Sequence, residues 1–317
     1  MWVWILFIAM VIVFLALDLG VFHKNEHVIK SKEAGIWTAV WVTVALAFSG
    51  AVYWLFSEGL VENPTQLAPD KAVIKYITGY LIELSLSIDN VFVIAVIFSS
   101  FKIPALYQHR VLFWGILGAI VFRGLMIVFG VALINKFEWI IYVFGVFLLF
   151  TAYKMLKGDD SDFDPKNSWI FKSINKVYPV TPELHGHDFF VRKDGIRAAT
   201  PLFLALMVIE LTDVLFALDS IPAILAITSD PFLVFSSNIL AILGLRSMYF
   251  LISRMLEKFR YINYSLVVIL AFVGIKMLVS HHIEFPEWLS LTVIAVALLG
   301  GILASLAFQK KDTEEIG

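Results

Sequence analysis

Five acidic residues lie well inside two strongly apolar stretches of the sequence, at 73–99 and 198–227. These residues are Glu83, Asp89, Glu210, Asp213 and Asp219. A carboxylate at the centre of a lipid bilayer costs roughly 2.5–3.5 kcal/mol, so the full set would cost on the order of 12–17 kcal/mol. Acidic residues inside membrane spans therefore need positive partners, and they mark ion or proton pathways.

Basic residues inside apolar stretches are fewer. Arg123 and Arg246 lie in two other stretches and could balance two of the five negative charges. A bound divalent cation, or protons on some of the acids, would balance the rest. An alternative is that the acids only pair with Arg123, Arg246 and Lys276 as ties between helices. Because the acids fall in two related stretches, we favour a pathway for a cation or proton.

The side chains inside the stretches also indicate which ion could bind. All seven histidines fall in loops or at the ends of the stretches, and the chain has no cysteine. The available ligands are therefore carboxylates, the amide of Asn90, hydroxyls and carbonyl oxygens. Oxygen ligands suit Mg²⁺, Ca²⁺ and Mn²⁺ rather than Cu⁺ or Zn²⁺. We expect a metal ion as substrate and no prosthetic group.

The acidic residues belong to an internal repeat. Three segments recur in the same order with their charged residues aligned: 83–91 with 213–221, 117–123 with 240–246, and 150–156 with 272–278. Each unit contains three apolar stretches, so the second unit enters the membrane from the opposite face. This inverted repeat is typical of secondary transporters, whose binding sites lie near the midplane between the repeats.

A proline predicts a helix break in the second acidic stretch. Glu210 and Asp213 are three residues apart and share one helix face, whereas Asp219 faces away from Glu210. Pro222 cannot donate a hydrogen bond to the carbonyl of Leu218. Either the helix lies at the centre of the bundle or it breaks, and Pro222 favours a break, with a freed carbonyl beside Asp219.

The elements that must position these residues are membrane-spanning helices. Apolar residues make up 60% of the 317 residues and charged residues 16%, and the mean hydropathy is +0.86. This composition excludes a soluble enzyme and a disordered chain. The net charge of −2 leaves no basic excess to bind nucleic acid.

A span needs roughly 20 apolar residues. Nine stretches approach that length, at 2–22, 36–56, 73–99, 111–130, 139–156, 198–227, 232–252, 264–279 and 288–308. We therefore expect an all-α polytopic membrane protein with about nine transmembrane helices. Spans 3–5 and 6–8 would form the inverted three-helix repeat. The corresponding divisions are peripheral spans at 1–72, repeat 1 at 73–157, a loop at 158–197, repeat 2 at 198–280, and span 9 with a tail at 281–317.

The distribution of basic residues predicts the orientation. Eighteen of the 24 Lys and Arg residues fall on the side that holds the first loop, and three fall on the opposite side. Short loops rich in Lys and Arg stay in the cytoplasm. The N-terminus is then outside, and both the 158–197 loop and the C-terminus are cytoplasmic.

Three longer motifs resemble the TerC family, which is named for tellurite resistance. The motifs begin at Glu83, Glu210 and Ser237, and they read ELSLSIDNVF, ELTDVLFALDSIPA and SNILAILGLRSMYF. The likeness extends over about residues 5–308 and is strongest to the Alx-like branch of the family. It implies a Mn²⁺ exporter of the bacterial inner membrane that protects cells from manganese excess. It also implies that the acidic positions of the family form a metal path. Matched one by one to this sequence, these positions are Glu83, Asp89, Glu210, Asp213 and Asp219. Asn90 follows Asp89 and Ser220 follows Asp219, as in the family.

The residues thus favour a transporter of a hard divalent cation rather than an enzyme, and the resemblance alone adds Mn²⁺ and the export direction. Its partners would be the metal ion and the lipid bilayer, and Arg123 and Arg246 would balance charge. Proton coupling is compatible with this function, because low pH protonates carboxylates and releases metal. One alternative is an intramembrane aspartyl hydrolase, in which two aspartates share a proton. Another is a membrane scaffold that helps other membrane proteins to fold or insert.

Overall fold

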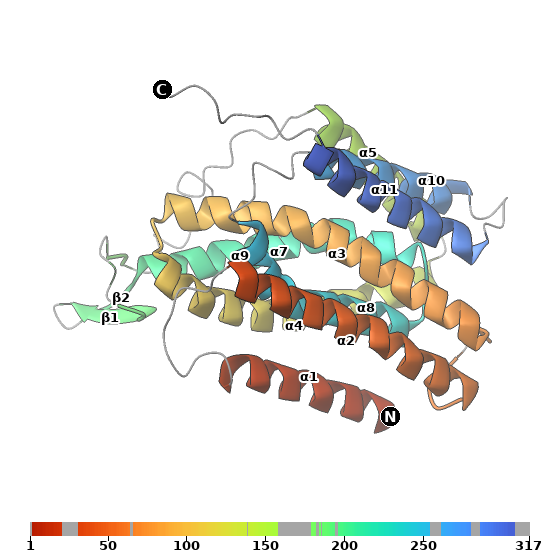
Figure 1. Cartoon of the computed structure of the whole chain (residues 1–317), viewed down its shortest axis with the longest axis horizontal. Coiled ribbons are helices and arrows are strands. Elements are labelled where there is room, and N and C mark those ends of the chain that lie inside the picture. The colour runs from red at the N-terminus through yellow and green to blue at the C-terminus, as the bar shows by residue number, and fades with distance from the viewer. Residues whose placement is uncertain are drawn as a thin grey trace.

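The computed structural model describes residues 2–20, 31–63, 66–137, 139–157, 179–181, 184, 186–193, 196–253, 261–279 and 286–307. Its helices form an elongated bundle with one small hairpin at one end (Figure 1). The helices are α1 (Trp2–Gly20), α2 (Ser31–Ser57), α3 (Pro69–Ser100), α4 (Ala105–Lys136), α5 (Ile140–Lys157), α7 (Pro201–Leu225), α8 (Pro231–Leu243), α9 (Leu245–Ile252), α10 (Ile262–Val279) and α11 (Glu287–Ala307). The strands are β1 (Phe190–Lys193) and β2 (Ile196–Ala199).

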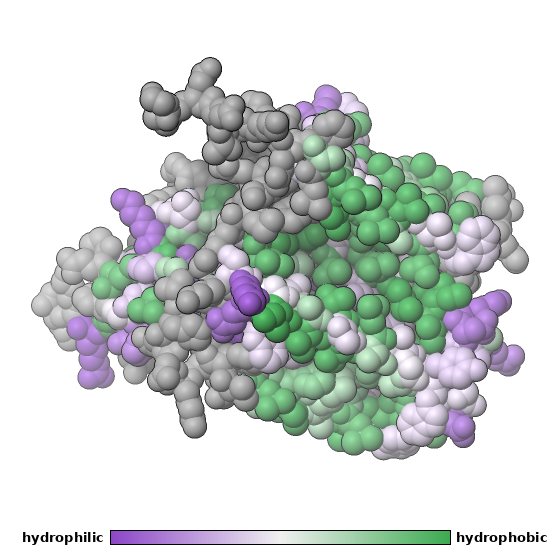
Figure 2. All heavy atoms as spheres, viewed as in Figure 1, coloured by the Kyte–Doolittle hydropathy of each residue, from purple (hydrophilic) through white to green (hydrophobic). Residues whose placement is uncertain are grey.

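Every apolar stretch of the sequence contains a helix. Within the described residues, six helices are long and apolar enough to cross a membrane, namely α2, α3, α4, α5, α7 and α11. The bent pair α8 and α9 forms a seventh candidate span, and α1 and α10 contain shorter apolar helices. On the face shown in Figure 2, apolar residues cover much of the middle of the bundle, with hydrophilic residues toward both ends. The all-α polytopic membrane fold is confirmed, while the count of nine spans stays a prediction.

Proline residues fix where three of the helices begin. Pro69, Pro201 and Pro231 stand in the first turn of α3, α7 and α8. Proline suits this position because its fixed φ is helical and the first N–H groups of a helix have no partner within it. Asp230 caps α8, since its carboxylate accepts a hydrogen bond from the Leu233 amide at 3.0 Å.

The helices of the proposed repeat units pack in a reciprocal pattern. α3 packs closely against α8, and its proposed counterpart α7 packs closely against α4. α5 packs against α10, and α3 contacts α7 directly. A two-fold relation that exchanges α3 with α7 and α4 with α8 would produce these pairings. The repeat itself stays a prediction.

Glycine allows a close approach between the two units where α5 crosses α10. A β-carbon at Gly145 of α5 would lie 3.1 Å from the carbonyl oxygen of Gly274 in α10, and one at Gly274 would lie 3.0 Å from the Gly145 oxygen. Both distances are too short for a larger residue without a shift of the backbone. Small residues at this crossing let α5 and α10 pack backbone to backbone, as is common in membranes.

The predicted helix break at Pro222 is wrong. α7 continues through Pro222 to Leu225. Pro222 lies in the last turn, where its missing N–H leaves only the Leu218 carbonyl without its usual donor, so the helix tolerates it. The bend occurs instead between α8 and α9, which meet at 43°. Gly244 stands at this bend, and glycine is a weak helix former.

The loop between the two units contains a short hairpin. Strands β1 and β2 pair antiparallel, with Phe190 opposite Ala199. The Thr200 hydroxyl donates to the Asp188 carbonyl oxygen at 2.7 Å and ties the hairpin to the start of α7. Residues 158–178 lie outside the described residues.

Candidate functional site

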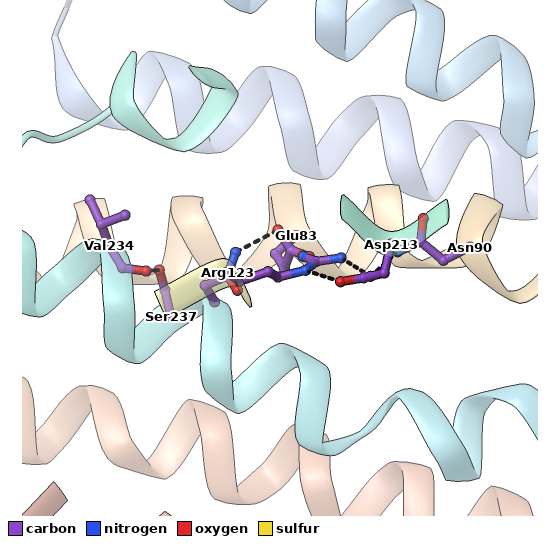
Figure 3. Close-up of polar contacts among 7 residues, drawn as sticks. Glu83, Asn90, Arg123, Asp213, Val234 and Ser237 are labelled. Atoms are coloured by element: carbon purple, nitrogen blue, oxygen red, sulfur yellow. Dashed lines mark hydrogen bonds and ion pairs between the residues drawn. The ribbon is translucent and has the colours of Figure 1, made fainter. Parts of the chain in front are cut away.

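Arg123 of α4 bridges two carboxylates on two other helices (Figure 3). Its Nη1 atom donates to Oε1 of Glu83 on α3. Its Nε atom donates to Oδ2 of Asp213 on α7 at 3.0 Å, and its Nη2 atom donates to Oδ1 of the same carboxylate at 2.6 Å. Two parallel bonds from one guanidinium make a strong and geometrically specific ion pair. Arg123 therefore ties α3, α4 and α7 together.

The cluster is buried. Arg123 is 1% exposed, Glu83 0% and Asp213 8%. Gly115, Ala119 and Arg123 recur every fourth residue along α4, so they form one stripe on the helix. Gly115 and Ala119 line a cavity together with residues of α7, and the small stripe lets α7 approach. Long side chains on a helix point toward its N-terminus. The Arg123 side chain therefore extends along this stripe, and its guanidinium reaches the acids.

Two amides complete the bonding of the acids. The Asn238 Nδ2 atom on α8 donates to Glu83 Oε2 at 2.9 Å. The Asn90 Nδ2 atom on α3 donates to Asp213 Oδ1 at 3.4 Å. Each carboxylate is thus held by the same arginine and by one amide from another helix. Asn238 was not expected at the site. Its position in an apolar stretch, eight residues before Arg246, could have marked it as a candidate site residue.

Glu210 lies next to this cluster without joining it. It precedes Asp213 by one turn of α7, and its carboxylate occupies the space that a β-carbon at Gly118 of α4 would need. Its buried Oε2 atom has no hydrogen-bond partner among the described residues. The Oε2 atom of Glu210 is therefore available as a ligand as far as the described residues show.

The remaining predicted site residues lie apart or are not placed. Asp219 accepts a hydrogen bond at 2.9 Å from the Thr151 hydroxyl of α5, so it contacts a different helix from Asp213. Arg246 is buried in α9. Asp89 lies in α3, but its side chain is outside the described residues. The described side chains bring together Glu83, Asn90, Arg123 and Asp213.

In this conformation the cation between the acids is an arginine. Within the described part of the chain, no group of three or more Asp, Glu or His residues lies close enough to hold a metal ion. Arg123 stands where it separates Glu83 from Asp213. Glu83 and Asp213 thus take part in an ion pair that ties helices together, which was the alternative considered above. Several buried oxygens of α3, α7 and α8 lack a hydrogen-bond partner among the described residues, among them those of Ser85, Ser87 and Ser220 and the Oδ1 atoms of Asn90 and Asn238.

The chain matches known membrane proteins along nearly its whole length. Residues 68–313 match the model of the integral membrane protein TerC family. An uncharacterized membrane protein of Myxococcus xanthus is 50% identical over 303 residues, which cover 96% of this chain and 91% of that protein. A relative from Rickettsia bellii, with the same description, is 44% identical over 96% of each chain.

One relative has a more specific name. Alx of Escherichia coli O157:H7, named as a candidate membrane-bound redox modulator, is 42% identical over 98% of this chain and 96% of its own length. No solved structure matches the chain. The family model covers most of the sequence, including both acidic helices and the Arg123 cluster. The chain belongs to the TerC family of integral membrane proteins.

Proposed function

We propose that this protein exports a divalent cation, most simply Mn²⁺, across the bacterial inner membrane. The observation that carries the proposal is the sharing of Arg123 between Glu83 of α3 and Asp213 of α7. A purely structural tie needs one carboxylate for one arginine. Here a single positive charge faces two buried negative charges, so the pair has the charge and the ligands to accept another cation.

The charges of the neighbouring groups support a divalent ion. Glu83, Asp213 and Glu210 carry three negative charges when ionised, and Arg123 carries one positive charge. The balance of minus two equals the charge of one divalent cation. A smaller or larger charge on the ion would leave this buried group unbalanced, at a cost that the membrane interior makes high.

Exchange of partners would let the ion enter. Arg123 can remain paired with Glu83, which Asn238 also holds. Asp213 can then pass from Arg123 to the ion. Glu210 on the same face of α7 and Asn90 Oδ1, which has no hydrogen-bond partner among the described residues, would bind the ion as well. When the ion leaves, Arg123 retakes Asp213 and neutralises it. Asp89 and Asp219 would supply further ligands along α3 and α7.

The identity of the ion and its direction depend on less direct arguments. Carboxylate and amide oxygens suit Mn²⁺, Mg²⁺ and Ca²⁺, and the resemblance to the family favours manganese and export. The orientation with the N-terminus outside follows from the positions of Lys and Arg. The name of the Escherichia coli relative suggests a link to redox chemistry, but this chain has no cysteine, so its own residues cannot carry out thiol–disulfide exchange.

The alternative functions lack a supporting contact. An intramembrane aspartyl hydrolase requires two carboxyl groups that share a proton, whereas Glu83 and Asp213 are separated by Arg123. A scaffold would have no need for Glu210, a partly buried acid whose buried Oε2 atom finds no hydrogen-bond donor in the described part of the chain.

Transport by inside-out membrane vesicles tests the proposal. Vesicles that contain the wild-type protein should accumulate Mn²⁺ when an energy source is supplied, and vesicles that contain Asp213→Asn should not. Glu58→Gln, at an exposed position after the end of α2, is the matched control and should transport like wild type. Vesicles with wild-type protein that take up no more Mn²⁺ than empty vesicles would contradict the proposal.

A further inference from the structure

The β1–β2 hairpin projects beyond the helices at the end of the bundle where α7 begins (Figure 1). α7 is long and apolar enough to span a membrane, so the hairpin lies next to the membrane boundary at which this span starts. The Thr200 hydroxyl bonds the Asp188 carbonyl oxygen, and the Ala199 amide donates to the Pro179 carbonyl oxygen at 2.8 Å. These bonds fix the base of the hairpin to the start of α7.

The base of the hairpin exposes an aromatic ring. Phe190 begins β1, and the centre of its ring lies 4.4 Å from that of Phe203, in the first turn of α7. Phe190 is nevertheless 43% exposed. Its neighbour Phe189 packs against the core instead, with the Arg110 guanidinium 5.1 Å from the centre of its ring. An exposed apolar ring at the start of a span is suited to contact lipid where headgroups meet acyl chains.

Two arginines stand opposite each other further along the hairpin. The strand register pairs Arg192 with Arg197, and it pairs Phe190 with Ala199. Arg192 is exposed. It lies on the same face of the strand as Phe190, roughly 6.6 Å further from the start of α7, because alternate residues share a face and each residue adds about 3.3 Å. Like charges at directly opposite positions destabilise a pair of strands, and an anion bound there would remove this cost.

The surrounding charges also favour an anion. Residues 188–199 include three basic and two acidic residues, namely Arg192, Lys193, Arg197, Asp188 and Asp194, and Arg110 adds a further positive charge at the base. A guanidinium binds phosphate strongly, because two of its N–H groups can reach two oxygens. Anionic phospholipids of the cytoplasmic leaflet attract Lys and Arg residues beside a span, and the distribution of basic residues predicts that the hairpin is cytoplasmic.

We propose that the face of the hairpin that carries Phe190 and Arg192 binds one anionic phospholipid. The lipid phosphate lies between Arg192 and Arg197, and an acyl chain lies along Phe190 and Phe203. A soluble phosphate ion would serve the two arginines but would leave the exposed ring without a partner, so the ligand is a lipid. The inference goes beyond the proposed function, because it concerns the membrane around the protein rather than the transported ion.

Binding of phosphatidylglycerol to the purified full-length protein tests this site. The protein is placed in nanodiscs of phosphatidylcholine, with and without phosphatidylglycerol, and both the bound lipid and the melting temperature are measured. A double variant, Arg192→Gln with Arg197→Gln, removes both charges of the pair. The matched control is Lys154→Gln with Lys157→Gln, which removes two exposed charges from the last turn of α5, also on the predicted cytoplasmic side.

The arginine variant should bind phosphatidylglycerol roughly tenfold more weakly than wild type, since it loses hydrogen bonds to a charged group. Phosphatidylglycerol should raise the melting temperature of wild type and of the lysine control, and should leave that of the arginine variant unchanged. In phosphatidylcholine alone, the arginine variant should melt at the wild-type temperature or above it, because the repulsion between the two arginines is gone. A residue needed only for the fold would lower the melting temperature in both lipids.

Three results would overturn the site. An equal loss of phosphatidylglycerol binding in the lysine control would show that any cytoplasmic positive charge is sufficient. Inorganic phosphate that stabilises wild type as much as phosphatidylglycerol does would show that the ligand is a free anion. Wild-type binding of phosphatidylglycerol by the arginine variant would show that the hairpin does not hold the lipid. If the double variant does not fold, Arg192→Gln alone is measured, and its unchanged binding of phosphatidylglycerol would have the same meaning.

Discussion

Arg123 and Asp213 form a two-point ion pair between α4 and α7, with Nε 3.0 Å from Oδ2 and Nη2 2.6 Å from Oδ1. The same guanidinium donates to Glu83 on α3. One buried cation thus connects the two acidic helices of the proposed repeat. This relationship makes Arg123 important for stability, while the excess negative charge around it is what the transport proposal uses.

Removal of the arginine should destabilise the protein. Arg123→Gln leaves Glu83 and Asp213 buried without their cation, and loss of one partner from a buried ion pair costs about 3–5 kcal/mol. The melting temperature of the purified protein in detergent should fall clearly. Lys157→Gln, at the exposed end of α5, is the control and should melt like wild type. An Arg123→Gln protein with the wild-type melting temperature would contradict the ion-pair geometry.

Glu210 should show the opposite pattern. Its Oε2 atom lacks a hydrogen-bond partner in the described part of the chain, so Glu210→Gln removes a partly buried charge without breaking a bond to that atom. Stability should hold or rise, whereas Mn²⁺ transport in vesicles should be lost. Transport at the wild-type rate would remove Glu210 from the ion path, and a large fall in melting temperature would show that it is a structural tie.

Asp219 allows its charge to be separated from its hydrogen bond. Asp219→Asn keeps an oxygen that can accept from the Thr151 hydroxyl, so the protein should remain stable. If the charge of Asp219 serves the ion path, transport should fall. Thr151→Ala breaks the hydrogen bond and keeps the charge, so it should lower stability slightly, by about 0.5–1.5 kcal/mol, and retain transport. Equal transport by Asp219→Asn and wild type would exclude Asp219 from the path.

The absence of cysteine makes the orientation directly testable. A single cysteine introduced at Glu58 or at Arg192 would be the only thiol in each variant. A membrane-impermeant thiol reagent applied to whole spheroplasts should label Glu58→Cys and not Arg192→Cys. After the membranes are opened, both variants should react. Labelling of Arg192→Cys in intact spheroplasts would reverse the orientation and the direction of transport argued from it.

The fold follows from the sequence more fully than the site does. The length of each apolar stretch was enough to locate a helix in every predicted span. The bilayer core sets the length of a span, and its lack of water requires a backbone that is hydrogen-bonded within the helix. The bend at Gly244 was missed because proline outweighed glycine as a breaker, although Pro222 lies where a helix ends anyway. Proline disrupts a helix interior more than glycine does, but Pro222 lies in the last turn of α7, where its effect is small.

Side-chain partners could be foreseen only in part. The sequence suggested Arg123 as a balance for the acids, but the choice of Glu83 and Asp213 depends on how α3, α4 and α7 pack. Asn238 was not foreseen, because an amide in an apolar span gives no charge signal.

The account is tested most directly by the stability of the purified protein with and without Mn²⁺. A ligand that binds only the folded state stabilises it by RT ln(1 + [L]/Kd), which is about 2.7 kcal/mol when its concentration is about 100 times Kd. We predict this stabilisation for wild type and for the Glu58→Gln control, and its loss in Asp213→Asn, which should still fold because Arg123 keeps Glu83. An Asp213→Asn protein that retains the full Mn²⁺-dependent rise in melting temperature would contradict the assignment of the ion site to Asp213.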